Sequence, residues 1–66
     1  MLKLYVICAR SVSLDNRMTF RATEAEAMKR YDNAVARYTA DVTVEMYVAH
    51  SPVYAAAGER QLRVSA

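Results

Sequence analysis

The spacing of the hydrophobic positions changes at Thr23. Two stretches before it, residues 2–10 and 17–22, alternate with the period of two that is typical of strands, and turn-forming residues lie between them at 11–16. Directly after Thr23, apolar residues recur at the spacing of an amphipathic helix. The pattern therefore predicts a β-hairpin that leads straight into a helix.

The alternation also predicts which hairpin side chains face the core. The core face is expected to carry Leu2, Leu4, Val6 and Cys8 from the first strand and Met18, Phe20 and Ala22 from the second. The opposite face of the sheet, called the far face below, is expected to carry Lys3, Tyr5, Ile7, Ala9, Arg17, Thr19 and Arg21. On this interpretation only one face of the sheet is packed against the helix.

The start of the helix has a clear capping signal. Thr23 is suited to be the N-cap residue, and Glu26 three positions later can complete a capping box. An apolar stripe follows, made of Ala27, Met28, Tyr31, Ala34, Val35 and Tyr38. We expect the helix to end near residue 39 or 40, with Tyr31 and Tyr38 in the core and their hydroxyls at its rim. Met18, Met28 and Met46 are expected to fill the core from three different elements.

Two further strands are predicted after the helix. Residues 42–49 alternate, with Val42, Val44, Met46 and Val48 expected in the core and Thr43, Glu45, Tyr47 and Ala49 on the far face. Ser51, Pro52 and Gly58 bracket a predicted short helix. Residues 61–65 are expected to form a fourth strand, with Leu62 and Val64 turned inward and Gln61 and Arg63 outward.

The order of these elements restricts their assembly. A right-handed crossover from the first strand through the helix places the third strand beside the first. We therefore expect one α+β domain over residues 1–66, with an antiparallel sheet in the order 2-1-3-4 and the helix on one face.

Composition limits the setting of this domain. The chain has 66 residues, is 55% hydrophobic and contains one glycine and one proline, so part of its apolar surface is expected to meet a partner protein or a second copy. Its single cysteine excludes an internal disulfide, and no apolar run approaches the roughly 20 residues that span a bilayer. The stretch of residues 1–9 lacks the features of a signal peptide. These features predict a cytoplasmic protein that is not bound to a membrane.

Catalytic chemistry finds little support in the sequence. His50 precedes a proline in a predicted loop and has no evident partner, and Cys8 alternates with apolar residues as core cysteines do. One histidine and one cysteine cannot form a structural zinc site. We therefore expect no enzyme activity, no metal, no cofactor and no small-molecule substrate.

The far face is the candidate binding surface, through Tyr5, Ile7, Arg17, Arg21, Tyr47 and Arg63. Tyrosine and arginine are enriched at the energetic centres of protein interfaces, which favours a protein partner or self-association through this face or an exposed edge strand. The same residue types bind single-stranded nucleic acid, since rings stack on bases and cations contact phosphates. Glu45 in the middle of the face disfavours phosphate. A solvated face without a role is the third interpretation.

The segments KLYVICAR, RMTFRAT, TEAEAMKRYDNAVARY and DVTVEMYVAH stand in an order that resembles the compact ββαβ inhibitors of phages and mobile elements, including some anti-CRISPR proteins. The resemblance covers residues 2–49 at the level of pattern. It implies stoichiometric binding to a bacterial protein complex and inhibition by occlusion, without catalysis.

Overall fold

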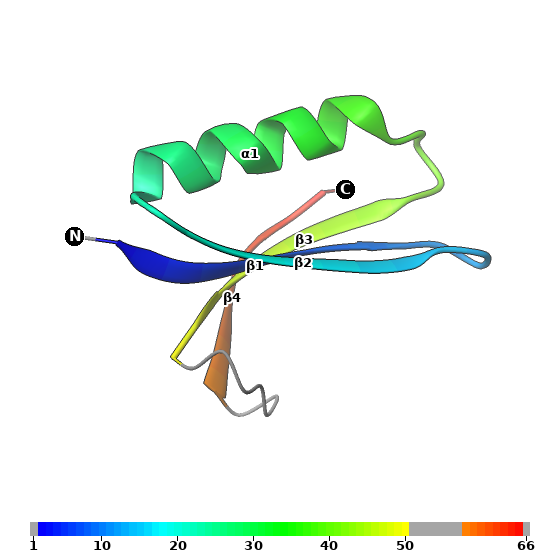
Figure 1. The fold of residues 1–66 in the computed structure, drawn as a ribbon. Helices are drawn as coiled ribbons and strands as arrows, with labels where there is room; N and C mark the ends of the chain where they lie inside the picture. Colours follow the sequence, from blue (N-terminus) through cyan, green and yellow to red (C-terminus); the bar gives the residue numbers. More distant parts are fainter. Residues whose placement is uncertain (1, 51–57, 66) are drawn as a thin grey trace.

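The computed structural model of this chain describes residues 2–50 and 58–65, and they form an α+β fold (Figure 1). Its elements are β1 (Lys3–Arg10), β2 (Asp15–Ala22), α1 (Glu24–Arg37), β3 (Thr43–Ala49) and β4 (Glu59–Val64). The helix lies across one side of the sheet, as predicted. The predicted short helix between Ser51 and Gly58 lies, apart from Gly58 itself, outside the described residues.

Helix α1 begins where the capping signal places it. The Thr23 hydroxyl accepts a hydrogen bond from the backbone N–H of Glu26, and the Glu26 carboxylate accepts one in return from the Thr23 N–H. The helix ends at Arg37, two or three residues before the predicted end. Its C-cap is Tyr38, whose backbone is extended and whose N–H donates to the Ala34 carbonyl.

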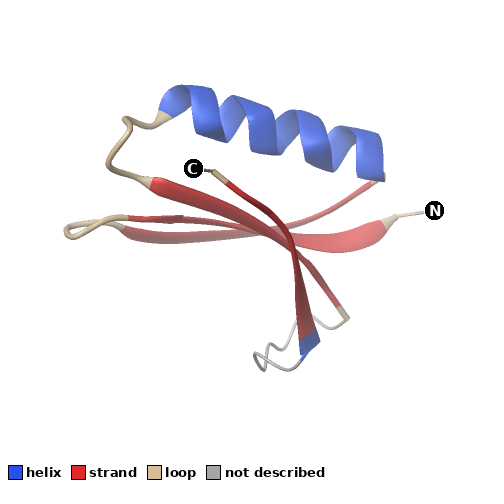
Figure 2. Ribbon diagram, turned by 180° about the vertical axis from the view of Figure 1, so that it is seen from behind, coloured by secondary structure: helices blue, strands red, loops and turns tan. Residues whose placement is uncertain are grey.

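The four strands form one antiparallel sheet in the predicted order β2-β1-β3-β4. A short turn joins β1 to β2, closed by a hydrogen bond from the Ser11 N–H to the Leu14 carbonyl at 2.7 Å. The sheet is strongly twisted, so the end of β3 and the start of β4 lie on the side away from the helix, whereas the end of β4 approaches the helix side (Figures 1 and 2).

The prediction for the faces of β1 is wrong, because its two alternating sets of side chains lie on the opposite faces from those predicted. Tyr5, Ile7 and Ala9 point toward α1 and pack with Ala22, Ala27, Tyr31, Val44 and Met46 in the main core. The register agrees, because Tyr5 lies opposite Phe20 and Val48, and residues directly opposite each other share a face. Both alternating sets of β1 are apolar, so their hydrophobicity could not distinguish the two orientations.

The other set of β1 side chains forms a second, smaller core on the far face. Leu4, Val6, Cys8 and Ala49 are buried there, and Tyr47 packs against them. Leu2, which was expected in the core with them, is exposed. The central strand is thus buried on both faces, and the far face is not the uncovered platform that the alternation predicted.

The core predictions for β2, α1 and β3 hold at most positions. Phe20, Ala22, Val44 and Met46 contribute to the main core, and Tyr31 is buried with its hydroxyl donating to the Val44 carbonyl at 3.5 Å. Met18 is the main exception, because it lies at the edge of the sheet and is 47% exposed. Val35 on the helix is also exposed.

Strand β4 contains an irregularity that changes the direction of its side chains. Its pairing with β3 shifts between Met46 and Tyr47, so that Gln61 lies opposite Tyr47 but Arg63 lies opposite Met46, and Leu62 is the extra residue. Gln61 therefore shares the far face with Tyr47 as predicted, whereas Arg63 lies on the helix side. The predicted place of Arg63 on the far face is wrong because a bulge reverses the alternation.

Candidate functional site

The six predicted binding residues do not share one surface. Tyr5 is 1% exposed and Ile7 is 5% exposed, and both lie in the main core under α1. The Tyr5 ring stacks on Phe20, with 6.0 Å between the ring centroids. Neither residue can present its side chain to a partner, and the prediction that they lie on the far face is wrong.

Arg17 lies on the far face, beside Cys8 of the second core. Its guanidinium forms an ion pair with the Glu59 carboxylate, which joins the two edge strands β2 and β4 across the sheet. It also approaches the Cys8 sulfur, 3.7 Å from Nη1. The twist that brings the start of β4 to the far side makes this contact possible (Figure 1). Arg17 thus covers Cys8, and the thiol is buried.

Tyr47 belongs to a second cluster of polar side chains on the same face. Its hydroxyl donates to the Glu45 carboxylate at 2.7 Å, and the other Glu45 oxygen lies 3.6 Å from Arg10 Nη1. The hydrogen bond to Glu45, together with burial, raises the pKa of Tyr47 above its ordinary value. A phenol fixed in this way, with its ring packed on the second core, is a poor surface for base stacking.

These placements change both binding hypotheses. Stacking on nucleic acid requires rings that present their faces to solvent, and Tyr5 and Tyr47 lie on opposite sides of the sheet. A protein partner does not require paired rings. It needs a surface with exposed apolar and charged groups, and the hollow bordered by Arg21 provides both.

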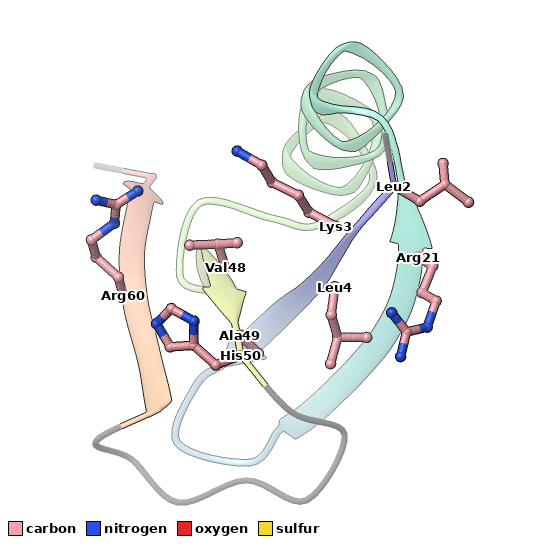
Figure 3. Close-up of a pocket in the computed structure, with 8 residues that line it drawn as sticks. All are labelled: Leu2, Lys3, Leu4, Arg21, Val48, Ala49, His50 and Arg60. Atoms are coloured by element: carbon pink, nitrogen blue, oxygen red, sulfur yellow. The ribbon is translucent and has the colours of Figure 1, made fainter.

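Arg21, the remaining predicted residue, borders a hollow of about 450 Å³ at the end of the sheet where β1 begins and β3 ends (Figure 3). Its lining consists of Leu2, Lys3, Leu4, Arg21, Val48, Ala49, His50 and Arg60. Lys3 and Arg60 lie opposite helix-side residues, and Arg21 lies opposite Leu4 of the far face. The strongly twisted end of the sheet brings these groups around one opening.

The polar side chains around this hollow all carry or can carry positive charge. Lys3, Arg21 and Arg60 are exposed cations, His50 is an exposed imidazole, and no lining residue is acidic. The remaining lining residues are aliphatic. The hollow can therefore receive a group that combines negative charge with an apolar part, and it offers no aromatic ring to a base.

Candidate metal ligands do not gather in the described part of the chain. Within residues 2–50 and 58–65, no three His, Cys, Asp or Glu side chains are placed to hold a metal ion. His50 lines the hollow among cations, and Cys8 is in the second core. No helix in the described residues is long and apolar enough to cross a membrane.

Sequence reasoning missed Lys3 and Arg60 as lining residues of the hollow, and Glu59 as the ion-pair partner of Arg17. Lys3 was assigned to the same face as Tyr5, and this much is correct, but the face itself was misidentified. Arg60 and Glu59 lie in a segment where the sequence predicts no strand until residue 61. Residues 59–61 are all polar, so no alternation of apolar and polar side chains could have extended the predicted strand to them.

Comparison with protein-family models, with curated proteins and with solved structures finds no match to this chain. Its function is therefore inferred from the geometry of the hollow and of the sheet edges.

Proposed function

We propose that this chain is a small non-enzymatic protein-binding module, and that it contacts an acidic, partly apolar segment of its partner at the hollow between Lys3, Arg21 and Arg60. The observation that supports the proposal is the lining itself, in which exposed cations surround aliphatic side chains without an acidic residue. Carboxylates of a partner would meet the cations, and aliphatic side chains would contact Leu2 and Val48.

The choice of protein over nucleic acid follows from the apolar part of the hollow. Nucleic acid binding combines cations for phosphates with aromatic faces for bases. Here the cations surround leucine, valine and alanine, which contact aliphatic protein side chains better than they stack on bases. Inhibition by occlusion of a bacterial protein complex, as the pattern resemblance implies, is the form of action that we propose for such a module.

The proposal is tested with two labelled probes of equal negative charge, a peptide of alternating Glu and Leu and an oligothymidylate. Fluorescence anisotropy would measure their binding to the wild type, to Lys3→Glu/Arg60→Glu and to the control Lys29→Glu/Arg37→Glu. Both variants change the net charge equally, but the control residues lie on the helix.

We expect the wild type to prefer the peptide. The hollow variant should lose affinity about tenfold or more, equivalent to roughly 1.4 kcal/mol, while the control keeps most of it. Equal losses in both variants would show that net charge alone drives binding and would overturn the proposal. Preference for the oligonucleotide with a steep dependence on salt would establish the nucleic-acid alternative in its place.

A further inference from the structure

Strand β2 is an edge of the sheet with a regular ladder to its only neighbour in the strand order. Its eight residues pair with β1 without a shift in register. The other edge, β4, is interrupted by the bulge at Leu62. Bulges and charged side chains are the means by which proteins prevent edge strands from pairing further. Both edges carry three charged residues, but β2 has no bulge. If either edge pairs with another strand, β2 is therefore the better candidate.

The hydrogen bond that closes the hairpin shows which backbone groups of β2 point outward. Ser11 and Leu14 are a hydrogen-bonded pair, and in an antiparallel ladder such pairs alternate along the strands. Asn16, Met18 and Phe20 therefore direct their N–H and C=O groups at β1. The backbone groups of the odd-numbered residues 15–21 point to the outer side of β2, and the side chains of these residues lie on the far face.

A second copy of β2 can pair with this edge antiparallel about a two-fold axis, and the backbone pattern restricts the register. Outward-directed groups must meet outward-directed groups, so the axis must pass through a residue, and the central choices are Arg17, Met18 and Thr19. Any register centred between two residues would place far-face side chains opposite helix-side ones.

Charge distinguishes these three registers. An axis at Met18 places Asp15 opposite Arg21 of the second copy, twice by symmetry. An axis at Arg17 places two arginines against each other. An axis at Thr19 places Arg17 opposite Arg21, again twice. Only the register centred on Met18 brings opposite charges together, and it repels no pair along the strand.

The exposure of the side chains agrees with this register. The Asp15 side chain is 86% exposed, and its ion pair with Arg10 is long, at 3.9 Å, so its carboxylate can reach a second cation. On the helix side, Met18 would meet Met18 of the second copy. A hollow of about 290 Å³, bordered by Met18, Arg30 and Ala34, lies beside it between β2 and α1 and has room for the thioether of the other copy.

We propose that β2 is a self-association edge, which pairs antiparallel with β2 of a second copy about a two-fold axis at Met18. The two four-stranded sheets would then form one continuous sheet of eight strands, with both helices on the same side. This inference goes beyond the proposed function: of the cations around the hollow it involves Arg21, whereas Lys3 and Arg60 take no part in it.

Single cysteines on β2 test the register directly. In this arrangement the two Met18 residues form a non-hydrogen-bonded pair with Cα atoms about 4.5 Å apart, within the range of a disulfide. The two Asn16 residues would lie about 14 Å apart, four residues along the strand, beyond that range. Mild oxidation should therefore cross-link Met18→Cys, whereas Asn16→Cys and the wild type with its buried Cys8 remain single chains on a non-reducing gel. Absence of the Met18→Cys dimer, or equally fast cross-linking of Asn16→Cys, would overturn the proposal.

A charge exchange tests the same pairing without cross-links. Sedimentation equilibrium should show a reversible dimer of the wild type, a loss of affinity of about tenfold or more for Asp15→Arg and for Arg21→Asp, and recovery in the double variant. Circular dichroism would confirm that each variant is folded. A wild type that stays monomeric at millimolar concentration, or a double variant as weak as the single ones, would overturn the inference. Peptide binding by Lys3→Glu/Arg60→Glu and dimerisation of Asp15→Arg each leave Arg21 unchanged, so these two readouts let the two proposals fail independently.

Discussion

Tyr47 shows how a single side chain can belong to the structure although its type and position indicate binding. Tyrosine on a sheet face beside arginine is typical of an interface, and the sequence correctly places Tyr47 on the far face. Its hydroxyl nevertheless donates to Glu45, and its ring packs against Leu4, Val6 and Cys8. The alternation of the strand could predict the direction of this side chain, but it could not predict that the hydroxyl donates a hydrogen bond to Glu45.

Replacing Tyr47 with phenylalanine should remove this hydrogen bond and cost about 0.5–1.5 kcal/mol at neutral pH. The pKa of Tyr47 is raised in the folded state, so its contribution is fully present below about pH 10 and is lost as pH rises through the folded value. Urea unfolding at pH 8 and pH 11 should therefore show a smaller alkaline loss of stability in Tyr47→Phe.

Some alkaline loss should remain in that variant, because burial also raises the pKa of Tyr31. An alkaline loss identical to that of the wild type would contradict the role given to the bond between Tyr47 and Glu45. Tyr38→Phe, on the other side of the sheet, is the matched control.

Among the elements, helix α1 and the hairpin of β1 and β2 differ in how much of their structure can be predicted from their sequences. The capping box at Thr23 has specific chemistry, and it places the start of α1 correctly. Strand β1 has two apolar sets, and the choice between them depends on what packs on each side. Arg17 and Glu59 form an ion pair on the face of one of these sets, and their contact depends on the twist of the whole sheet. The order of the strands could therefore be predicted from the sequence, whereas the inner face of the central strand could not.

Substitution of Thr23 with alanine should destabilise the protein by about 1 kcal/mol, since the first turn of α1 loses its cap. The Thr23 hydroxyl also donates to the Glu26 carboxylate at 2.9 Å, and this side-chain bond is the main cause that lowers the pKa of Glu26. The resulting stabilisation is present above the ordinary glutamate pKa and is lost as pH falls through the folded value. Urea unfolding at pH 7 and pH 3 should show that Thr23→Ala removes this part of the acid sensitivity. Glu24→Gln changes a carboxylate in the same turn and serves as control; an equal effect of both substitutions would speak against a specific capping box.

At the scale of the whole molecule, the two faces of the sheet differ. The helix packs on one face with apolar side chains, whereas the other face carries the second core and an ion pair between the two edge strands. The candidate site was only partly predictable from the sequence, because its geometry depends on the twist of the sheet. Arg21 was identified from its strand, but the hollow that it borders forms from residues of all four strands and depends on their twist.

Removal of the Arg17 cation should therefore cost more than neutralisation of Glu59. Arg17→Met would leave a nearly buried carboxylate without its ion-pair partner, which we expect to destabilise the fold by about 1–3 kcal/mol. Glu59→Gln keeps a hydrogen-bonding group and should cost less, and the double variant Arg17→Met/Glu59→Gln should recover part of the loss. Thermal unfolding of the three variants, with Arg37→Met as control, would measure this coupling. Strictly additive effects would show that the two residues do not interact.

The bulge at Leu62 has a consequence for growth of the proposed assembly. A two-fold pairing of regular edges leaves both irregular edges on the outside, where the break in the ladder and the arginines at positions 60 and 63 oppose addition of a third chain. Such an assembly would stop at two molecules instead of extending into a fibre. Deletion of Leu62 would remove the bulge and make the β4 edge regular. Pairing could then continue at both edges, and the chains could form a filament.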